Sequence, residues 1–137
     1  MDNTTIDQEA EALLRDASRE LTEPHAGECL LCFVSRMIDD FGCDTTLRWA
    51  ARFRDVRAPR ATALAQRLGD VGGFCDCEVF LNGYRVAAQL CERDKWGDLV
   101  APGGRPSCMG ARRGSTKPCG AWERRRRHPP RLVAGGL

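Results

Sequence analysis

The stretch CLLCFVSRMIDDFG, residues 29–42, decides the fold of this chain. Its apolar side chains recur every three or four residues, which is the spacing of one face of an α-helix. These side chains are Leu30, Phe33, Val34, Met37, Ile38 and Phe41. Gly42 follows them, at the position where helices commonly end. The stretch therefore predicts a core helix over residues 30–41 with a pair of cysteines at its N-terminal end.

Two pairs of cysteines have the spacing of metal ligands. Cys29 and Cys32 lie at the predicted helix start, where both sulfurs can reach one ion and the free backbone N–H groups favour thiolates. Cys75 and Cys77 lie in a segment that alternates like a strand, so their side chains point to the same side. We therefore predict a structural zinc site formed by these four cysteines. Cys43 is an alternative ligand, because together with the two pairs it makes five candidate cysteines for the four coordination positions of zinc.

The predicted site does not indicate catalysis. Four thiolates close the coordination of zinc and leave no position for water or a substrate. Asp76 and Glu78 flank the second pair, and we expect both carboxylates to face solvent, because extra acids disfavour a complex that is already negative. The chain has two histidines, His25 and His128, and no arrangement of acid, base and nucleophile is recognisable. The sequence therefore does not favour an enzyme.

The charge of the chain is unevenly distributed. Residues 1–28 contain eight acidic and two basic residues, whereas residues 101–137 contain nine basic residues and one acidic residue. The acidic segment also has apolar side chains at helical spacing, so we predict an acidic N-terminal helix in residues 1–24, laid on the body. A cysteine-rich folded domain is expected in residues 25–93. Residues 94–137 are rich in glycine, proline and arginine, so we predict that this basic tail is disordered.

The folded domain is predicted to be a small α+β structure. Helical periodicity continues over residues 45–56 and 60–71. Residues 74–81 then alternate, and Asn82-Gly83 is a strong signal for a β-hairpin whose second strand is 84–86. The sequence thus predicts three to four helices and one hairpin, clasped by the four-cysteine metal site.

Two groups of arginines are candidates for contact with nucleic acid. Arg48 and Arg52 lie on the outer side of the helix predicted for residues 45–56, and a run of four arginines follows Trp122. The candidates are Arg48, Arg52, Arg124, Arg125, Arg126 and Arg127. Such clusters can bind phosphates, and a solvated face paired with nearby acids is the alternative. The predicted partner is a nucleic acid or another protein, reached through this basic strip and the tail.

The N-terminus and the hydropathy indicate a cytoplasmic protein. Residues 1–7 are acidic and polar, unlike a secretory signal, and no apolar run approaches the ~18 residues of a membrane span. In a reducing compartment, paired cysteines bind metal or perform redox chemistry. A small zinc-stabilised interaction module is therefore the first functional hypothesis. The alternative is a thiol redox or metal-sensing protein that uses Cys29 and Cys32.

Three blocks of the sequence, at residues 27–37, 41–49 and 72–82, resemble an uncharacterised bacterial family called domain of unknown function 2695. The family patterns include Cys-x2-Cys, Gly-Cys-Asp and Cys-Asp-Cys-Glu. The resemblance spans about residues 25–86 and implies that Cys43 belongs to the pattern. It implies a bacterial, cytoplasmic origin and a folded unit over 25–86, and it implies no particular activity.

Overall fold

The helix predicted over residues 30–41 forms the centre of the structure. In the computed structural model, which describes residues 3–126, α2 spans Leu30–Phe41, and Gly42 follows with a φ of 81°. The face of α2 that carries Phe33 packs on α3 (Arg48–Arg57), where the ring of Phe33 lies 5.8 Å from that of Phe53. Both rings are buried, so α2 and α3 together form most of the apolar core.

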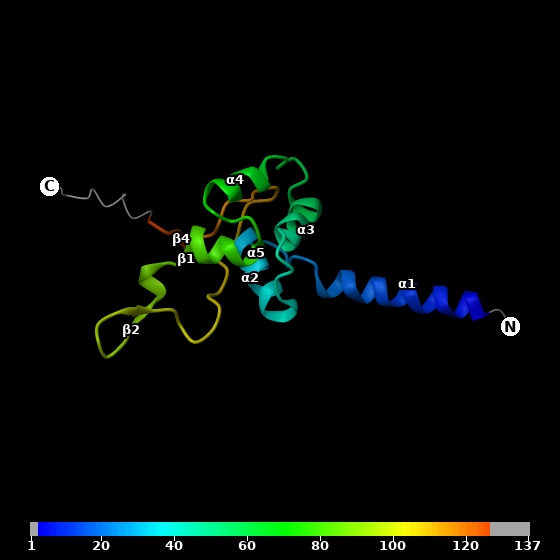
Figure 1. Cartoon of the computed structure of the whole chain (residues 1–137), viewed down its shortest axis with the longest axis horizontal. Coiled ribbons are helices and arrows are strands. Elements are labelled where there is room, and N and C mark those ends of the chain that lie inside the picture. The colour runs from blue at the N-terminus through cyan, green and yellow to red at the C-terminus, as the bar shows by residue number, and fades with distance from the viewer. Residues whose placement is uncertain (1–2, 127–137) are drawn as a thin grey trace.

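The remaining elements surround this pair (Figure 1). The other predicted helices are present as α1 (Asn3–Leu21) and α4 (Leu64–Asp70), and a short α5 (Asp76–Glu78) leads into the π-helix η1 (Val79–Gly83). The strands are β1 (Tyr84–Val86), β2 (Glu92–Arg93), β3 (Leu99–Val100) and β4 (Trp122–Arg124), with the 3-10 turn η2 (Ala88–Leu90) between β1 and β2. The fold is therefore α+β.

The hairpin predicted across Asn82-Gly83 is replaced by helix. Residues 76–83 form α5 and η1, and the strand that follows, β1, pairs with β4 from the distant tail, with Val86 opposite Trp122. The hairpin of the structure lies further along the chain, where β2 pairs with β3. The local turn signal of Asn82-Gly83 is outweighed by tertiary contacts, since α5 is bound to the start of α3.

Asp76 makes that attachment. Its carboxylate is fully buried and accepts hydrogen bonds from the backbone N–H groups of Trp49, at 2.8 Å, and Ala50, at 3.1 Å. These are N–H groups of the first turn of α3, which have no partner within the helix. Burial raises the pKa of Asp76, and the two hydrogen bonds partly offset this rise. The expectation that Asp76 faces solvent was wrong.

The N-terminal helix projects from the body and does not lie on it as predicted (Figure 1). Leu13 and Leu14 on α1 are 70% and 71% exposed, so the described part of the chain leaves the apolar stripe of α1 uncovered. The linker after α1 is held by α3 instead. There, Arg52 Nε donates to the carbonyl of Thr22 at 3.3 Å, and Arg57 donates to the carbonyl of Pro24 at 2.7 Å.

The segment predicted as a disordered tail is packed on the body as far as the structure describes it. Cys119 and Ala121 are buried in the core, and β4 pairs with β1. Arg105 donates to the carboxylate of Asp39 on α2 at 2.7 Å. Residues 127–137, which include Arg127, lie outside the described residues, so the prediction for them stays a prediction.

Replacing Asp76 with alanine should destabilise the fold strongly. The change leaves two buried N–H groups without acceptors, which costs about 1–3 kcal/mol for each group. We therefore expect the free energy of unfolding in denaturant titrations to fall by about 3 kcal/mol, and by less for Asp76→Asn. Asp55→Ala is the control, because Asp55 is exposed and pairs with its neighbour Arg54. Equal losses for Asp76→Ala and Asp55→Ala would refute the capping role.

Candidate metal centre

Four cysteine sulfurs from three parts of the chain meet at the N-terminal end of α2. Cys29 is the N-cap residue of α2, and Cys32 lies in its first turn. Cys108 comes from the irregular segment after β3, and Cys119 directly precedes the turn into β4. The four sulfurs lie within 4.8 Å of one another. We refer to these residues as the cysteine cluster.

The spacing of the sulfurs fits a tetrahedral ion. Four sulfurs bound to zinc at ~2.3 Å lie ~3.8 Å from one another in a regular tetrahedron. The sulfurs of Cys32 and Cys119 are 3.8 Å apart. A disulfide would need about 2.05 Å, and all four residues are free cysteines. The cluster is therefore compatible with a metal site closed by four thiolates.

Hydrogen-bond donors surround the sulfurs as they do around metal-bound thiolates. The Nε1–H of Trp122 donates to the sulfur of Cys32 at 3.2 Å. Backbone N–H groups contribute as well: that of Cys29 donates to Cys108 at 3.2 Å, and that of Gly110 donates to Cys108 at 3.4 Å. Each such bond stabilises negative charge on the sulfur that accepts it.

The Cys29 thiolate is favoured most. The thiol of Cys32 donates a hydrogen bond to the sulfur of Cys29, which lowers the pKa of Cys29, whereas burial raises it. The backbone N–H of Cys32 also donates to this sulfur, and the net effect lowers the pKa of Cys29 to about 5. The same interaction raises the pKa of Cys32. Cys29 thus supplies a thiolate at neutral pH, and an ion that binds there can displace the proton from Cys32.

The structure separates the two cysteine pairs that the sequence analysis combined. Cys29 and Cys32 cluster with Cys108 and Cys119, and the other pair is not part of this cluster. Cys75 and Cys77 lie instead beside Cys43, whose pKa is lowered, against the effect of burial, by hydrogen bonds from Cys77 and Cys75. The ligand set expected from the sequence, Cys29, Cys32, Cys75 and Cys77, therefore needs correction.

The physical reason for the difference is the helical conformation of residues 76–83. Because Asp76 binds the start of α3, Cys75 and Cys77 are held against the loop that contains Cys43, near the C-terminal end of α2. The cluster lies at the opposite end of the same helix. Cys108 and Cys119 gave only a weak sequence signal, since ten residues separate them and their surroundings resemble a disordered tail.

The candidate nucleic-acid residues are spread over two regions. Arg48 stacks on the ring of Trp49 with its guanidinium 4.0 Å from the ring centroid, while Arg52 binds the linker after α1. In the tail, Arg124 lies 5.6 Å from the ring centroid of Tyr84, and Arg125 donates to the carbonyl of Phe80 at 2.8 Å. Arg126 is exposed. These contacts orient several of the side chains toward the protein.

The residue before the cluster is anchored by an ion pair. Glu28 accepts two hydrogen bonds from Arg36, at 3.0 and 2.8 Å, and one from the backbone N–H of His25. The side chains of Glu28 and Arg36 are only 8% and 14% exposed. Burial raises the pKa of Glu28, but the hydrogen bonds and the charge of Arg36 outweigh it, and the pKa is lowered below 4.5. This pair fixes the approach to Cys29.

The comparisons with known proteins cover the middle of the chain. Residues 30–82 match the model of the family described as "Protein of unknown function (DUF2695)". Over these residues the chain is similar to that family, and we refer to them as the DUF2695 segment. The resemblance drawn from the sequence is thereby confirmed. The DUF2695 segment runs from α2 to η1, and it includes Cys32 of the cluster but ends before Cys108 and Cys119.

Similar curated proteins come from mycobacteria. The chain is 36% identical over 55 residues to the uncharacterized protein Mb2294 of Mycobacterium bovis and to the uncharacterized proteins MT2332 and Rv2271 of Mycobacterium tuberculosis. The match covers 40% of this chain and 56% of each relative, so the chain spans about half the length of the curated relatives it matches. No solved structure matches the chain significantly.

Replacing Glu28 with glutamine should destabilise the protein in a pH-dependent way. Loss of the charge-assisted hydrogen bonds to Arg36 should cost about 2 kcal/mol of unfolding free energy at pH 7. Because the pKa of Glu28 is lowered in the fold, its contribution is complete above pH 4.5 and is lost as the pH falls through the lowered value.

Denaturant titrations from pH 7 downward measure this difference against wild type at each pH, since acid also protonates the Cys29 thiolate in both proteins. The control is Glu11→Gln, which removes the same charge from an exposed position on α1. A Glu28→Gln difference that persists unchanged in acid would contradict the assignment.

Proposed function

We propose that this protein is a small zinc-stabilised module that acts by binding a partner, and that Cys29, Cys32, Cys108 and Cys119 hold the zinc. The observation that carries this proposal is the convergence of the four sulfurs within 4.8 Å. When bound, the ion would supply a crosslink between the start of α2 and the segment 108–119. A site closed by four thiolates is structural, because it has no open coordination position.

The surroundings of the cluster support a structural role. The apolar core is small, and small domains are commonly reinforced by a metal. Cys29, Cys32 and Cys119 are buried, while Cys108 lies at the edge nearest to solvent. An ion at this place would hold a segment that is irregular from residue 101 to β4. Within residues 3–126, every helix is too short or too polar to span a bilayer. The location that we propose for this module is the cytoplasm.

The second candidate is a thiol redox protein, and the lowered pKa of Cys29 favours it. In that case Cys29 and Cys32 would form a disulfide, releasing two protons and passing two electrons to a low-molecular-weight disulfide. Thiol titration before and after chelation separates the two candidates. One tightly held zinc with slowly reacting thiols supports the structural site, whereas a metal-free and reversibly oxidised pair supports redox chemistry.

Replacing Cys108 with serine should abolish zinc binding and destabilise the fold. Since metal binding contributes directly to the folding free energy, we expect a loss of about 3 kcal/mol or more and less than one zinc per chain. Metal analysis by mass spectrometry and thermal unfolding measure the two effects.

The matched control is Cys77→Ser, which changes a half-buried cysteine outside the cluster. This variant should keep one zinc per chain. The opposite pattern, with zinc lost from Cys77→Ser and retained by Cys108→Ser, would overturn the ligand assignment.

A further inference from the structure

We propose that a basic surface beside the cysteine cluster binds the phosphate backbone of a nucleic-acid duplex. This basic surface consists of Arg57, Arg60, Arg67, Arg112, Arg113 and Lys117, all of which are exposed. It contains none of the six candidate arginines named from the sequence, which are Arg48, Arg52, Arg124, Arg125, Arg126 and Arg127. The inference rests on the proposed function, because it names the partner of the zinc-stabilised module.

Three segments contribute to the basic surface. Arg57 ends α3, Arg60 follows in the next turn, and Arg67 lies on α4. The other members lie on the loop of residues 111–117, which runs beside α4 (Figure 1). The loop is joined to α4 by a hydrogen bond of 3.2 Å from Arg67 to the hydroxyl of Thr116. Residues far apart in sequence thus form one continuous surface.

Hollows between these segments give the surface a concave shape. One hollow of about 600 Å³ is lined by Arg60, Arg67 and Lys117. A second, of about 440 Å³, is lined by Arg57, Arg112 and Arg113. A third, of about 530 Å³, lies between them, because Arg57, Arg60 and Arg113 all contribute to it. A concave basic surface can accept a convex anionic partner such as a phosphate backbone.

Among residues 3–126, no ion pair uses the positive charge of the basic surface. The ion pairs between described residues use other arginines, on α1, α2, α3, β1 and the segment after β3. Glu28 is the one acidic residue that lines these three hollows, and it is paired with Arg36. Arg57 donates to a backbone carbonyl and Arg67 donates to a hydroxyl, and both of these acceptors are uncharged.

The cysteine cluster would control the shape of this surface. The loop of residues 111–117 lies between two proposed zinc ligands, Cys108 and Cys119. Its start is further held by the backbone N–H of Ala111, which donates to the carbonyl of Gly27 at 2.9 Å. Half of the basic surface is therefore carried by a segment whose two ends the ion would fix. Zinc binding and phosphate binding should be coupled for this reason.

The chemistry of the surface favours a duplex over a single strand. Proteins that bind single strands present exposed aromatic rings on which bases stack. The aromatic residues lining these hollows are Phe53, which is buried, and Tyr84, which is partly buried. The most exposed rings, Phe74 and Trp96, do not line them. The basic surface presents positive charge but no exposed aromatic ring on which a base could stack. Such a surface is suited to contact with the phosphates of a duplex.

The test is binding of the zinc-loaded full chain to a short DNA duplex of mixed sequence, measured by fluorescence anisotropy at several salt concentrations. The logarithm of the association constant should fall linearly with the logarithm of salt, by about 0.9 for each phosphate contact. The double variant Arg60→Gln/Arg113→Gln should reduce this slope by about 2 and weaken binding about tenfold or more at low salt.

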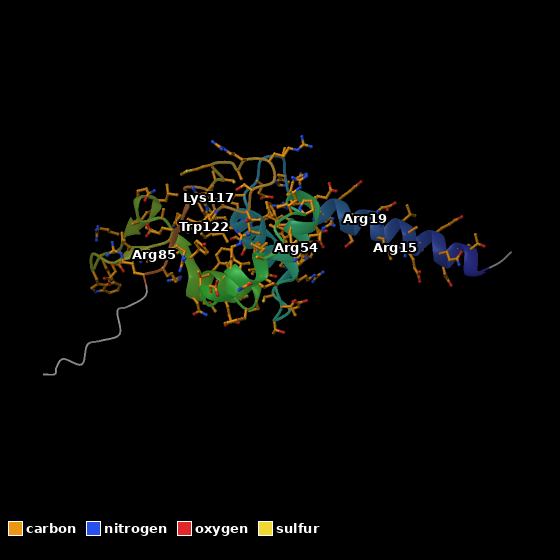
Figure 2. The ribbon with its side chains drawn as sticks, turned by 90° about the horizontal axis from the view of Figure 1, so that it is seen from above. Arg15, Arg19, Arg54, Arg85, Lys117 and Trp122 are labelled. Carbon is orange, nitrogen blue, oxygen red and sulfur yellow. The ribbon has the colours of Figure 1, made fainter. Side chains whose placement is uncertain are left out.

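The control is Arg15→Gln/Arg19→Gln, which removes the same charge from α1, on the side of the body away from Lys117 (Figure 2). It should bind the duplex like the wild type. Zinc content is measured on the same samples, so that a loss of the metal, which would contradict the proposed function, is distinguished from a loss of DNA binding alone. Equal weakening by both double variants, tighter binding of a single strand, or no salt-dependent binding would overturn the inference.

Discussion

The convergence of four sulfurs at the start of α2 joins the central helix to a distant part of the chain. This helix carries the core, and the two cysteines at its N-terminal end meet two others that come from the last third of the described chain. The segment between β3 and β4 has few apolar side chains in the core and few backbone hydrogen bonds to the body. A shared ion would supply the attachment that this segment does not obtain from burial.

A second attachment acts at the other end of α2 and uses a different kind of interaction. The buried carboxylate of Asp76 accepts hydrogen bonds from two N–H groups at the start of α3, and this contact holds the start of α5 against α3. The DUF2695 match covers this attachment completely and the cysteine cluster only in part. The chain thus combines a core whose packing is local in sequence with a cluster that joins distant segments.

The sequence predicted what depends on local periodicity and missed what depends on distant partners. The apolar spacing of residues 30–41 identified the central helix α2, and α1, α3 and α4 followed from the same kind of pattern. Asn82-Gly83 is a strong local turn signal, but it is outweighed by the hydrogen bonds that join Asp76 to the start of α3. Cys108 and Cys119 lie in a segment whose composition resembles disorder, so no local feature revealed that they complete the cluster.

The most direct measurement of the central claim is the alkylation rate of each cysteine, read by mass spectrometry, in zinc-loaded and in chelator-treated protein. Zinc should slow alkylation of all four members of the cysteine cluster, whereas Cys43, Cys75 and Cys77 should react at the same rate in both samples. Zinc-dependent protection of Cys75 and Cys77 in place of Cys108 and Cys119 would contradict the proposed ligand set.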